Sequence, residues 1–529
     1  MVDAPASPVA RERLDALARL VSGPTDREEP TRTDRDSLPI HAPYDDSVVG
    51  EVPSCTPDDV RDAVSKARAA ADEWAAWPVE DRVAVIRRFH DALLDRREDL
   101  LDVIQTETGK ARVDALEEVL DAATAARYYG NHAGQVLGST RRGGAIPLLT
   151  KTVEHHHPVG VVGIISPWNY PLSLSISEAI PALLAGNGVV IKPDEGTPFT
   201  ALWGLELLRE CGLPDDAVQV VTGEGPTLGE PLIEAVDYVS FTGSTEVGRT
   251  IAETAGRHLT ECSLELGGKN ALLVLDDANV ERAARGAARG CFANAGQLCI
   301  SIERIYVHES VADDFRDAFV REARALTLDA GYDYDHDVGS LLDDALLETV
   351  EAHVENAVEK GATVLTGGRA RPDLGPYFYE PTILTDVTPE MTLADEETFG
   401  PVVSLYEVET VSDAIEQTND SAYGLNASVW TENTERGEQV ATRLEAGTVN
   451  VNEAYAAAWG SFDAPMGGMK DSGIGRRHGR RGMLKYTESQ TVATQRIAPF
   501  SPPKRGKRLW ADSASFGVLL WKRISELGP

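Results

Sequence analysis

The sequence lacks long apolar segments. No run approaches the roughly 18 apolar residues that a membrane-spanning helix needs. Residues 1–20 are interrupted by charged side chains and do not contain the apolar core of a signal peptide. These absences exclude an integral membrane protein at the level of sequence, and we expect a cytoplasmic protein.

Cysteine is scarce, and no two cysteines form a Cys-x-x-Cys pair. The chain of 529 residues has only five, at Cys55, Cys211, Cys262, Cys291 and Cys299. Their small, odd number and their spacing predict neither a disulfide framework nor a zinc site, so we expect no bound metal. Each cysteine is by default a small buried apolar residue, although the surroundings of Cys299 suggest more.

Positive charge is also in short supply. Fifty Lys and Arg residues stand against 85 Asp and Glu, which gives a formal net charge of −35. Such a surface repels nucleic acid and anionic membranes, so neither is an expected partner. The acids are scattered rather than gathered in a tail, and 42% of the residues are hydrophobic. An acidic interaction protein and a salt-adapted (halophilic) protein both fit; we favour the second, because salt screens the self-repulsion.

What is present is a succession of segments with different patterns. Residues 1–56 are rich in Pro, Asp, Arg and Thr, and predict a loosely structured entry segment. Residues 57–136 predict helices, the first starting at Pro57 behind the capping residue Thr56. Residues 137–157 have a Gly-Gly turn between extended flanks, which is typical of a hairpin. Near the end, a helix is expected around residues 516–527.

Short apolar runs alternate with helical patterns from residue 159 onwards. Strands are expected at 159–166, 188–193, 217–223, 237–243, 259–268, 271–279, 304–310, 362–368 and 447–452. Buried strands that alternate with helices predict an α/β fold with a doubly wound parallel sheet. Ligands of such sheets bind beyond the carboxyl ends of the strands. The residues that directly follow the strands are therefore the candidate site.

The stretch FTGSTEVGRT (241–250) follows an expected strand and opens a helix. It departs from a nucleoside-triphosphate loop because Arg249 stands where such loops have lysine. Gly243 and Ser244 at a helix N-terminus are nevertheless suited to hold a phosphate. A plain strand-to-helix turn remains the alternative.

Four other stretches carry complementary chemical groups. Cys299 in NAGQLC follows a glycine in an apolar context, and Glu265 in LELGGKN stands at a strand end. Asn169 in SPWNYP is flanked by prolines, and Lys192 and Glu195 in IKPDEGTP follow the next strand. Each group alone has an ordinary structural explanation. Together they predict a thiol nucleophile, a base, an oxyanion donor and ligands for ribose hydroxyls.

With these residues the sequence resembles the NAD(P)-dependent aldehyde dehydrogenases over about residues 40–497. The motifs stand in the family's order: ETGK (107–110), PWNYP (167–171), IKPDEGTP (191–198), FTGSTEVG (241–248), LELGGKN (264–270), GQLC (296–299), EETFGPV (396–402) and PMGGMKDSGIGR (465–476). The resemblance implies that Cys299 attacks the aldehyde and that its backbone N–H and the Asn169 side chain hold the oxyanion. It further implies that Glu265 activates the water that hydrolyses the thioester.

The resemblance also implies the cofactor contacts. Lys192 and Glu195 are expected at the adenine ribose, Ser244 with Gly243 at the pyrophosphate, and Glu397 at the nicotinamide ribose. The remaining expected contacts are Phe399, Ser166, Pro167, Trp168, Leu266 and Gly267. A carboxylate at position 195 repels the 2′-phosphate of NADP, so NAD is the expected cofactor and NADP the alternative.

The domain organisation follows from the same resemblance. It implies an NAD(P)-binding domain of residues 1–136, 158–265 and 466–485, and a catalytic domain of residues 266–465. Residues 137–157 and 486–498 are expected to form an oligomerisation arm, and residues 499–529 a tail. The arm implies a homodimer or homotetramer.

The expected partner is a small-molecule aldehyde. Residues 296–307 and the long tail resemble a subgroup that oxidises succinate semialdehyde to succinate. Two arginines that bind the substrate carboxylate in such enzymes correspond to Ser177 and Ala293, so an uncharged aldehyde remains an alternative. Arg477 is a further departure, since many family members have Glu there. A non-catalytic protein on the same fold is a remote alternative, because the catalytic set is intact.

Overall fold

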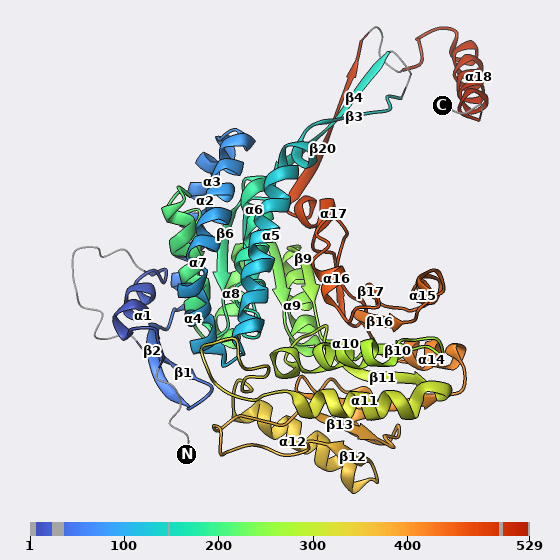
Figure 1. Ribbon diagram of the computed structural model, residues 1–529. Coiled ribbons are helices and arrows are strands. Elements are labelled where there is room, and N and C mark those ends of the chain that lie inside the picture. Colours follow the sequence, from blue (N-terminus) through green and yellow to red (C-terminus); the bar gives the residue numbers. More distant parts are fainter. Residues whose placement is uncertain (1–6, 24–35, 146–148, 497–500, 527–529) are drawn as a thin grey trace. The chain divides into compact units, whose positions relative to one another are not determined.

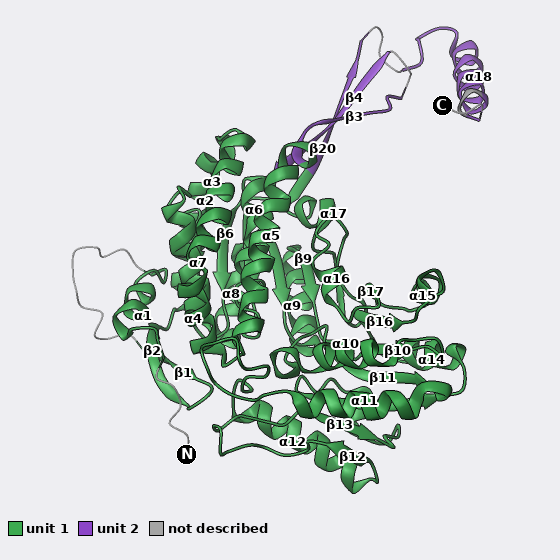
Figure 2. Cartoon of the chain, in the orientation of Figure 1, with its two compact units in different colours: residues 1–136, 158–488 green, residues 137–157, 489–529 purple. Residues whose placement is uncertain are grey.

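The computed structural model describes residues 7–23, 36–145, 149–496 and 501–526. They fall into two compact units (Figure 2). The first contains residues 1–136 and 158–488, and the second residues 137–157 and 489–529. The first unit holds two α/β sheets and every site discussed below.

The helical region begins as its sequence predicts. Helix α2 (Pro57–Ala76) starts behind Thr56, whose hydroxyl accepts a hydrogen bond from the Asp59 backbone N–H while the Asp59 carboxylate accepts one from the Thr56 N–H. This reciprocal cap satisfies two N–H groups that a helix start leaves open. The following helices are α3 (Val79–Asp95), α4 (Arg97–Thr108) and α5 (Arg112–Leu137).

The prediction of a loosely structured entry segment was wrong for the described part of residues 1–56. These residues form helix α1 (Arg11–Ala18) and an antiparallel hairpin of β1 (Ser37–Ala42) and β2 (Ser47–Pro53). Leu14 and Leu17 share one buried helix face, and Ile40 and Val52 are buried in the hairpin. A few buried apolar residues are therefore enough to order this segment despite its polar composition. Residues 1–6 and 24–35 of the predicted segment lie outside the described residues.

The first large sheet has the strand order β19-β9-β8-β5-β6-β7. Its strands are β5 (Val161–Ile165), β6 (Gly188–Lys192), β7 (Val218–Val220), β8 (Tyr238–Thr242), β9 (Glu261–Glu265) and β19 (Gly473–Ile474). All pair in parallel except β19. The connecting helices are α6 (Ile176–Ala185), α7 (Pro198–Glu210), α8 (Gly225–Ala235) and α9 (Thr245–His258). The strand order reverses between β5 and β8, where doubly wound sheets bind their ligands.

The second large sheet has the order β12-β13-β14-β11-β10-β16-β17, and only β12 is antiparallel to its neighbour. Its strands are β10 (Asn270–Val274), β11 (Ile302–His308), β12 (Thr363–Thr366), β13 (Thr382–Thr385), β14 (Val402–Val408), β16 (Asn426–Trp430) and β17 (Thr448–Val451). The main helices are α10 (Val280–Phe292), α11 (Ala312–Ala325), α12 (Asp344–Glu359), α14 (Val411–Asn419) and α15 (Thr434–Ala441). Figure 1 shows both sheets between layers of helices, which confirms the predicted doubly wound α/β fold.

Short elements connect these layers. They are the 3-10 turns Ala293–Gly296 and Glu309–Val311, α13 (Thr392–Asp395), α16 (Ala456–Trp459), α17 (Gly479–Leu484) and the paired strands β15 (Tyr423–Gly424) and β18 (Met469–Lys470). The turn at Ala293–Gly296 directly precedes the loop that carries Cys299.

The second unit contains a three-stranded sheet of order β20-β4-β3 and a helix. Strands β3 (Thr140–Arg142) and β4 (Thr150–Pro158) form the predicted antiparallel hairpin, and β20 (Thr487–Gln495) lies beside β4. Helix α18 (Lys507–Ser525) begins nine residues before the predicted helix start at 516. In the described part of the chain, no helix combines the length and apolar character required to span a membrane.

Candidate active site

The ends of β5 and β8 bring the first predicted residues together. Pro167, Trp168 and Asn169 follow β5, while Gly243 and Ser244 follow β8. The Ser244 hydroxyl accepts a hydrogen bond from the Val247 backbone N–H at 3.3 Å and so caps α9. The N-terminus of this helix faces the point where the sheet order reverses, which suits an anionic group.

A cavity of about 230 Å³, the strand-end cavity, opens at this place. Its lining residues are Pro167, Trp168, Asn169, Thr242, Gly243, Ser244, Leu266, Gly267, Cys299, Glu397 and Phe399. All but Thr242 were predicted from the sequence. Glycine at position 267 lets the Glu397 carboxylate approach the backbone, because a Cβ atom there would meet this carboxylate.

Four predicted residues lie outside this lining. Lys192 and Glu195 form an ion pair of 3.3 Å, and the Glu195 carboxylate also accepts from the Gly225 N–H at 2.7 Å. The buried Ser166 hydroxyl has no hydrogen-bond partner among the described residues. Glu265 ends strand β9, and Gly467 leaves room for its carboxylate.

The loop before Cys299 has an unusual backbone. Asn294, Ala295 and Gly296 have φ values of 50°, 54° and 75°. Left-handed residues other than glycine cost about 1–3 kcal/mol each and persist only where surrounding contacts hold them. Here the Asn294 backbone N–H donates to the Asp114 carboxylate at 2.9 Å, and the Leu342 N–H donates to the Gln297 side chain at 2.9 Å. These contacts hold the turn that presents Cys299 to the strand-end cavity.

The Cys299 thiol is neutral at rest. Burial, with the nearby Glu397 and Glu265 carboxylates, raises its pKa to about 12. Because the thiolate is the reactive form, the thiol must lose its proton to a base as it attacks.

Glu265 has the pKa of a base suited to neutral pH. Burial raises the pKa of this carboxyl to about 7, against the opposing effect of Arg477 and Lys485. A carboxylate of this kind accepts a proton readily and releases it again near neutrality.

The Asn169 side chain is fixed against the cysteine loop. Its Nδ2 donates to the Gln297 carbonyl oxygen at 2.9 Å. The amide has a second N–H, and Asn169 lines the strand-end cavity together with Cys299. The group thus meets the requirement for an oxyanion donor that needs no reorganisation.

Glu397 and Phe399 form the opposite wall of the cavity. The Glu397 carboxylate accepts from the Gly268 N–H at 2.8 Å, and burial and Glu303 raise its pKa to about 8. Phe399, at φ 56°, meets Trp168 edge-on with ring centroids 5.6 Å apart. The buried pair of Lys269 and Glu303, 2.6 Å apart, supports this segment, since Glu303 also accepts from the Phe399 N–H.

The donor set fits a nicotinamide dinucleotide. Lys192 and Glu195 offer partners for ribose hydroxyls. The buried Ser166 hydroxyl has no partner among the described residues and lies near them, because the Ser166 backbone N–H donates to the Lys192 carbonyl oxygen. Backbone N–H groups at the start of α9 suit phosphate, and Glu397 offers a second ribose contact.

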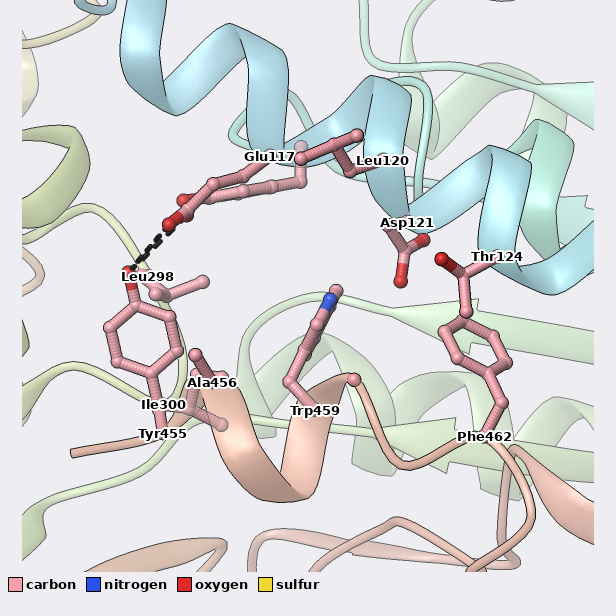
Figure 3. A pocket seen from close by; sticks show the side chains of 12 residues that line it. Glu117, Leu120, Asp121, Thr124, Leu298, Ile300, Tyr455, Ala456, Trp459 and Phe462 are labelled. Atoms are coloured by element: carbon pink, nitrogen blue, oxygen red, sulfur yellow. Dashed lines mark hydrogen bonds between the residues drawn. The ribbon is translucent and has the colours of Figure 1, made fainter. Parts of the chain in front are cut away.

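A second cavity of about 260 Å³, the aromatic cavity, is lined by residues of α5, of the segments that follow Asn169 and flank Cys299, and of the segment around Trp459 (Figure 3). It is lined by Glu117, Leu120, Asp121, Thr124, Tyr170, Leu298, Ile300, Tyr455, Ala456, Trp459, Gly460 and Phe462. Tyr170 is the neighbour of Asn169 and Leu298 the neighbour of Cys299, so this cavity adjoins the reactive thiol.

Two carboxylates project from α5 toward the aromatic cavity. Glu117 accepts a hydrogen bond from the Tyr455 hydroxyl at 3.2 Å. Asp121 accepts one from Ser177 at 3.0 Å through one oxygen, and its other oxygen has no partner among the described residues. Burial raises the pKa of Asp121 to about 6. Ser177 occupies one of the two positions that correspond to a substrate-binding arginine in the sequence analysis. Its hydroxyl instead donates a hydrogen bond to the Asp121 carboxylate.

Arg477 is buried beside this cavity. It pairs with Glu178 at 3.5 Å and lies over the Trp459 ring, 5.3 Å from its centroid. Although burial favours a neutral Glu178, Lys485 and Arg477 hold its pKa at about 2. The positive charge at position 477 is therefore matched by an acidic partner at position 178.

The chain belongs to the aldehyde dehydrogenase family, whose model matches residues 31–492. It is an aldehyde dehydrogenase, an oxidoreductase that uses NAD(P), as its sequence predicts. A Mycolicibacterium smegmatis protein provisionally named succinate-semialdehyde dehydrogenase (NADP(+)) is 54% identical over 89% of this chain and 91% of its own. The mitochondrial succinate-semialdehyde dehydrogenase of Arabidopsis thaliana is 36% identical over 87% of this chain and 86% of its own.

Comparison with solved structures leads to the same family. The crystal structure of Staphylococcus aureus betaine aldehyde dehydrogenase in complex with NAD+ superposes with a TM-score of 0.86 at 32% identity. The match covers 92% of this chain and 98% of that one. Fold class and family are thereby established from two directions.

Sequence reasoning missed Thr242 and the carboxylates of α5. A signal for the latter was present: Asp114, Glu117, Glu118 and Asp121 are spaced by three and four residues, which places them on one helix face. In a helix otherwise rich in alanine, such a row of acids suggests a buried polar function.

Proposed function

We propose that Cys299, Asn169 and Glu265 catalyse the oxidation of an aldehyde to its carboxylic acid through a cysteine thioester, with NAD(P) as the electron acceptor. The observation that carries this proposal is the strand-end cavity, which joins the Cys299 thiol and the Asn169 amide in one space near the end of β9, where Glu265 stands.

The residues divide the reaction into two steps. Cys299 Sγ bonds to the aldehyde carbon while the thiol proton passes to a base. The second N–H of Asn169 and the Cys299 backbone N–H then hold the oxyanion, a contribution typically worth ~10²–10³ in rate. A bound nicotinamide would supply the hydride acceptor, and loss of the hydride would leave a thioester on Cys299. Glu265 takes a proton from water as the hydroxide adds to the thioester. The C–S bond then breaks to release the acid, and the proton passes from Glu265 to the sulfur, which restores the thiol.

We propose NAD as the preferred form of the cofactor. The Glu195 carboxylate lies beside Lys192 and is anchored by the Gly225 N–H, so a 2′-phosphate placed there would meet a fixed negative charge. The S. aureus structure contains NAD+, whereas the name of the M. smegmatis relative gives NADP(+). Initial rates with each form decide the preference.

For the substrate we propose succinate semialdehyde. The support comes from relatives of this name, including the one that is 54% identical over most of both chains. The product is then succinate.

A specific observation favours a second candidate, an uncharged aldehyde. No lysine or arginine is among the described residues that line the aromatic cavity, while Glu117 and Asp121 are. Two guanidinium groups near this cavity are already paired: Arg289 with Asp114 and Glu117 at 2.8 and 2.6 Å, and Arg477 with Glu178 at 3.5 Å. A substrate carboxylate would meet charges of its own sign, whereas an apolar tail would meet tyrosine, tryptophan and phenylalanine rings.

The test is a set of initial rates of nicotinamide reduction in high salt. Succinate semialdehyde is compared with hexanal, benzaldehyde and betaine aldehyde, with Cys299→Ala as the inactive control. A preference for succinate semialdehyde supports the first candidate, and a preference for hexanal or benzaldehyde supports the second. Absence of oxidation of any aldehyde contradicts the proposal as a whole.

We further propose a cytoplasmic homodimer or homotetramer, built through the arm, in a salt-adapted cell. Strand β20 is exposed along nearly its whole length, as an oligomerisation strand in an isolated chain is. The net charge of −35 suits high salt. Light scattering in dilute and in molar KCl measures the oligomer and its dependence on salt.

A further inference from the structure

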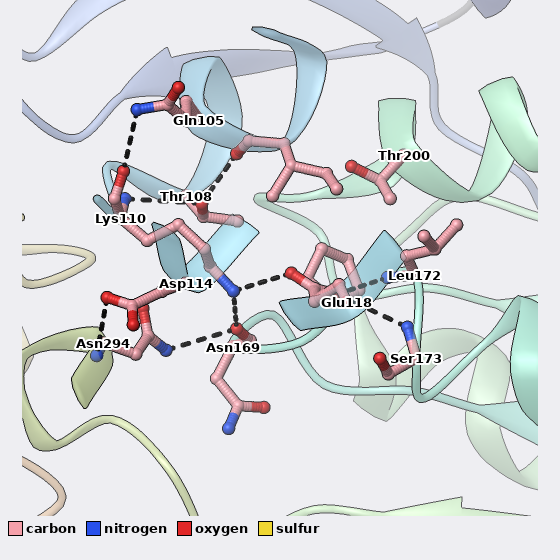
Figure 4. Close-up of polar contacts among 12 residues, drawn as sticks. Gln105, Thr108, Lys110, Asp114, Glu118, Asn169, Leu172, Ser173, Thr200 and Asn294 are labelled. Carbon is pink, nitrogen blue, oxygen red and sulfur yellow. Dashed lines mark hydrogen bonds and ion pairs between the residues drawn. The ribbon is translucent and has the colours of Figure 1, made fainter. Parts of the chain in front are cut away.

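A buried ion pair lies between helix α5 and the loop that carries Asn169 (Figure 4). Lys110 Nζ and the Glu118 carboxylate are 2.6 Å apart, and both side chains are completely shielded from solvent. Because two buried charges lose their hydration, such a pair is weak evidence for a stabilising role. Its contacts therefore need another explanation.

Both members of the pair hold the same loop. Lys110 Nζ donates to the Asn169 carbonyl oxygen at 2.6 Å and lies 4.0 Å from the centroid of the Tyr170 ring. The Glu118 carboxylate accepts from the backbone N–H groups of Leu172 at 2.8 Å and Ser173 at 3.3 Å. Asn169 and the residues after it are thus held from two sides by one charged pair.

The loop in turn is tied to the cysteine loop. The carbonyl oxygen of Asn169 also accepts from Asn294 Nδ2 at 3.3 Å, and that same nitrogen donates to the Gln297 carbonyl at 3.0 Å. The Gln297 carbonyl is the acceptor of the Asn169 side chain. Lys110 therefore fixes the backbone of Asn169, which lines the strand-end cavity together with Cys299. Misplacement of a catalytic group by about 1 Å can cost roughly 10²-fold in rate.

We propose that Lys110 and Glu118 are positioning residues that hold Asn169 in place for oxyanion stabilisation. This inference rests on the proposed function, because it assumes that Asn169 donates to the oxyanion. Neither residue lines the strand-end cavity, so both act through the loop. The lysine supplies the contact with Asn169, and the glutamate fixes the position of the ammonium group and of the Leu172 and Ser173 backbone.

The test is a double-mutant cycle between Lys110 and Asn169. Asn169→Ala is expected to lower kcat/KM by ~10²–10³-fold, and Lys110→Met by roughly 10- to 100-fold. In the Asn169→Ala background, Lys110→Met is expected to change kcat/KM by less than about 3-fold, because the amide it positions is gone. Independent effects that multiply in the double variant would overturn the inference.

Folding is controlled with a second variant. Lys110→Met with Glu118→Gln leaves no unpaired buried charge and keeps an oxygen for the Leu172 and Ser173 N–H groups. This double variant is expected to fold and to show the same decrease in kcat/KM as Lys110→Met alone. Full activity in this variant would contradict the positioning role. Arg112→Met is the matched control, since Arg112 is buried at the start of α5 but pairs with Glu98 and Asp102; it is expected to retain activity within about 2-fold.

Two further measurements separate positioning from general damage. The dissociation constant of the nicotinamide cofactor and the alkylation rate of Cys299 by iodoacetamide are expected to stay within about 2-fold in Lys110→Met, because neither depends on the oxyanion donor. Changes of 10-fold or more in both would show a distorted site and refute the inference. If Asn169→Ala itself retains activity, the proposed role of Asn169 fails, and with it the inference; if only Lys110→Met retains activity, the inference alone fails.

Discussion

The strand-end cavity and the aromatic cavity adjoin the same two loops, but different parts of the chain form their walls. The first is walled by backbone, glycines and a few motif residues at strand ends, among them Gly243 and Gly267. The second is walled by side chains from the middle of α5 and from the segment around Trp459. Backbone at strand ends is dictated by the fold, whereas side chains on a helix face can change without disturbing it.

This contrast separates the chemistry common to the family from the choice of substrate. A change at the first cavity is expected to abolish turnover for every aldehyde. A change at the second is expected to alter the ranking of aldehydes. The following predictions test that division, and the largest effect comes first.

Replacement of Cys299 by alanine is the strongest test of the strand-end cavity. Because no other group in this cavity can form the thioester, kcat is expected to fall by at least about 10⁴-fold with every aldehyde. Binding of the cofactor, measured by quenching of tryptophan fluorescence, should persist. Residual turnover within 100-fold of the unaltered chain would show that another residue is the nucleophile.

Glu265→Gln separates the two chemical steps. The amide cannot accept a proton from water, so hydrolysis of the thioester is expected to slow by ~10²–10⁴-fold. Rapid-mixing experiments should show a burst of reduced cofactor close to one equivalent per site, followed by a slow phase. A linear time course at the unaltered rate would exclude Glu265 as the base for hydrolysis.

The pH dependence of turnover should report the same carboxyl. Since Glu265 must be ionised to act as base, activity is expected to rise with pH through a midpoint near its pKa of about 7. Arg477 lowers this pKa, so Arg477→Met should move the midpoint to higher pH. Arg480→Met, at an exposed position of the same segment, serves as control. A midpoint that moves to lower pH, or equally in both variants, would contradict this assignment.

The same contrast explains what the sequence could predict. The doubly wound fold was predictable, because short apolar runs mark the strands, and Asn169, Gly243 and Ser244 directly follow strand ends. Other residues of the strand-end cavity, such as Leu266, Glu397 and Phe399, were expected only from the resemblance to the aldehyde dehydrogenases. The boundaries proposed for the cofactor and catalytic domains stay predictions. In the second sheet, β13, β14 and β16 were missed. Buried polar residues interrupt two of these strands: Ser404 in Val402–Val408, and Asn426 and Ser428 in Asn426–Trp430.

The aromatic cavity was not predictable in the same way. It joins α5 to a segment more than 330 positions later, as the hydrogen bond between Glu117 and Tyr455 shows. A local pattern indicates which residues share a helix face, but it does not indicate what that face meets. The three consecutive left-handed residues before Cys299 could not be predicted from the sequence either, because tertiary contacts rather than local preference hold Asn294 and Ala295 in this conformation.

Asp121→Asn addresses the aromatic cavity and has the smallest expected effect. The substitution keeps the shape of the side chain and the hydrogen bond from Ser177, but it removes the negative charge of the Asp121 carboxyl, whose pKa is about 6. At pH 8 the carboxyl is mostly ionised, so its loss should raise kcat/KM for succinate semialdehyde about 3- to 10-fold, as expected for like charges a few ångströms apart at intermediate dielectric. The value for hexanal should change by less than about 2-fold. At pH 5, where Asp121 is mostly protonated, the gain should shrink; an equal gain for both aldehydes would show that this cavity does not discriminate substrates by charge.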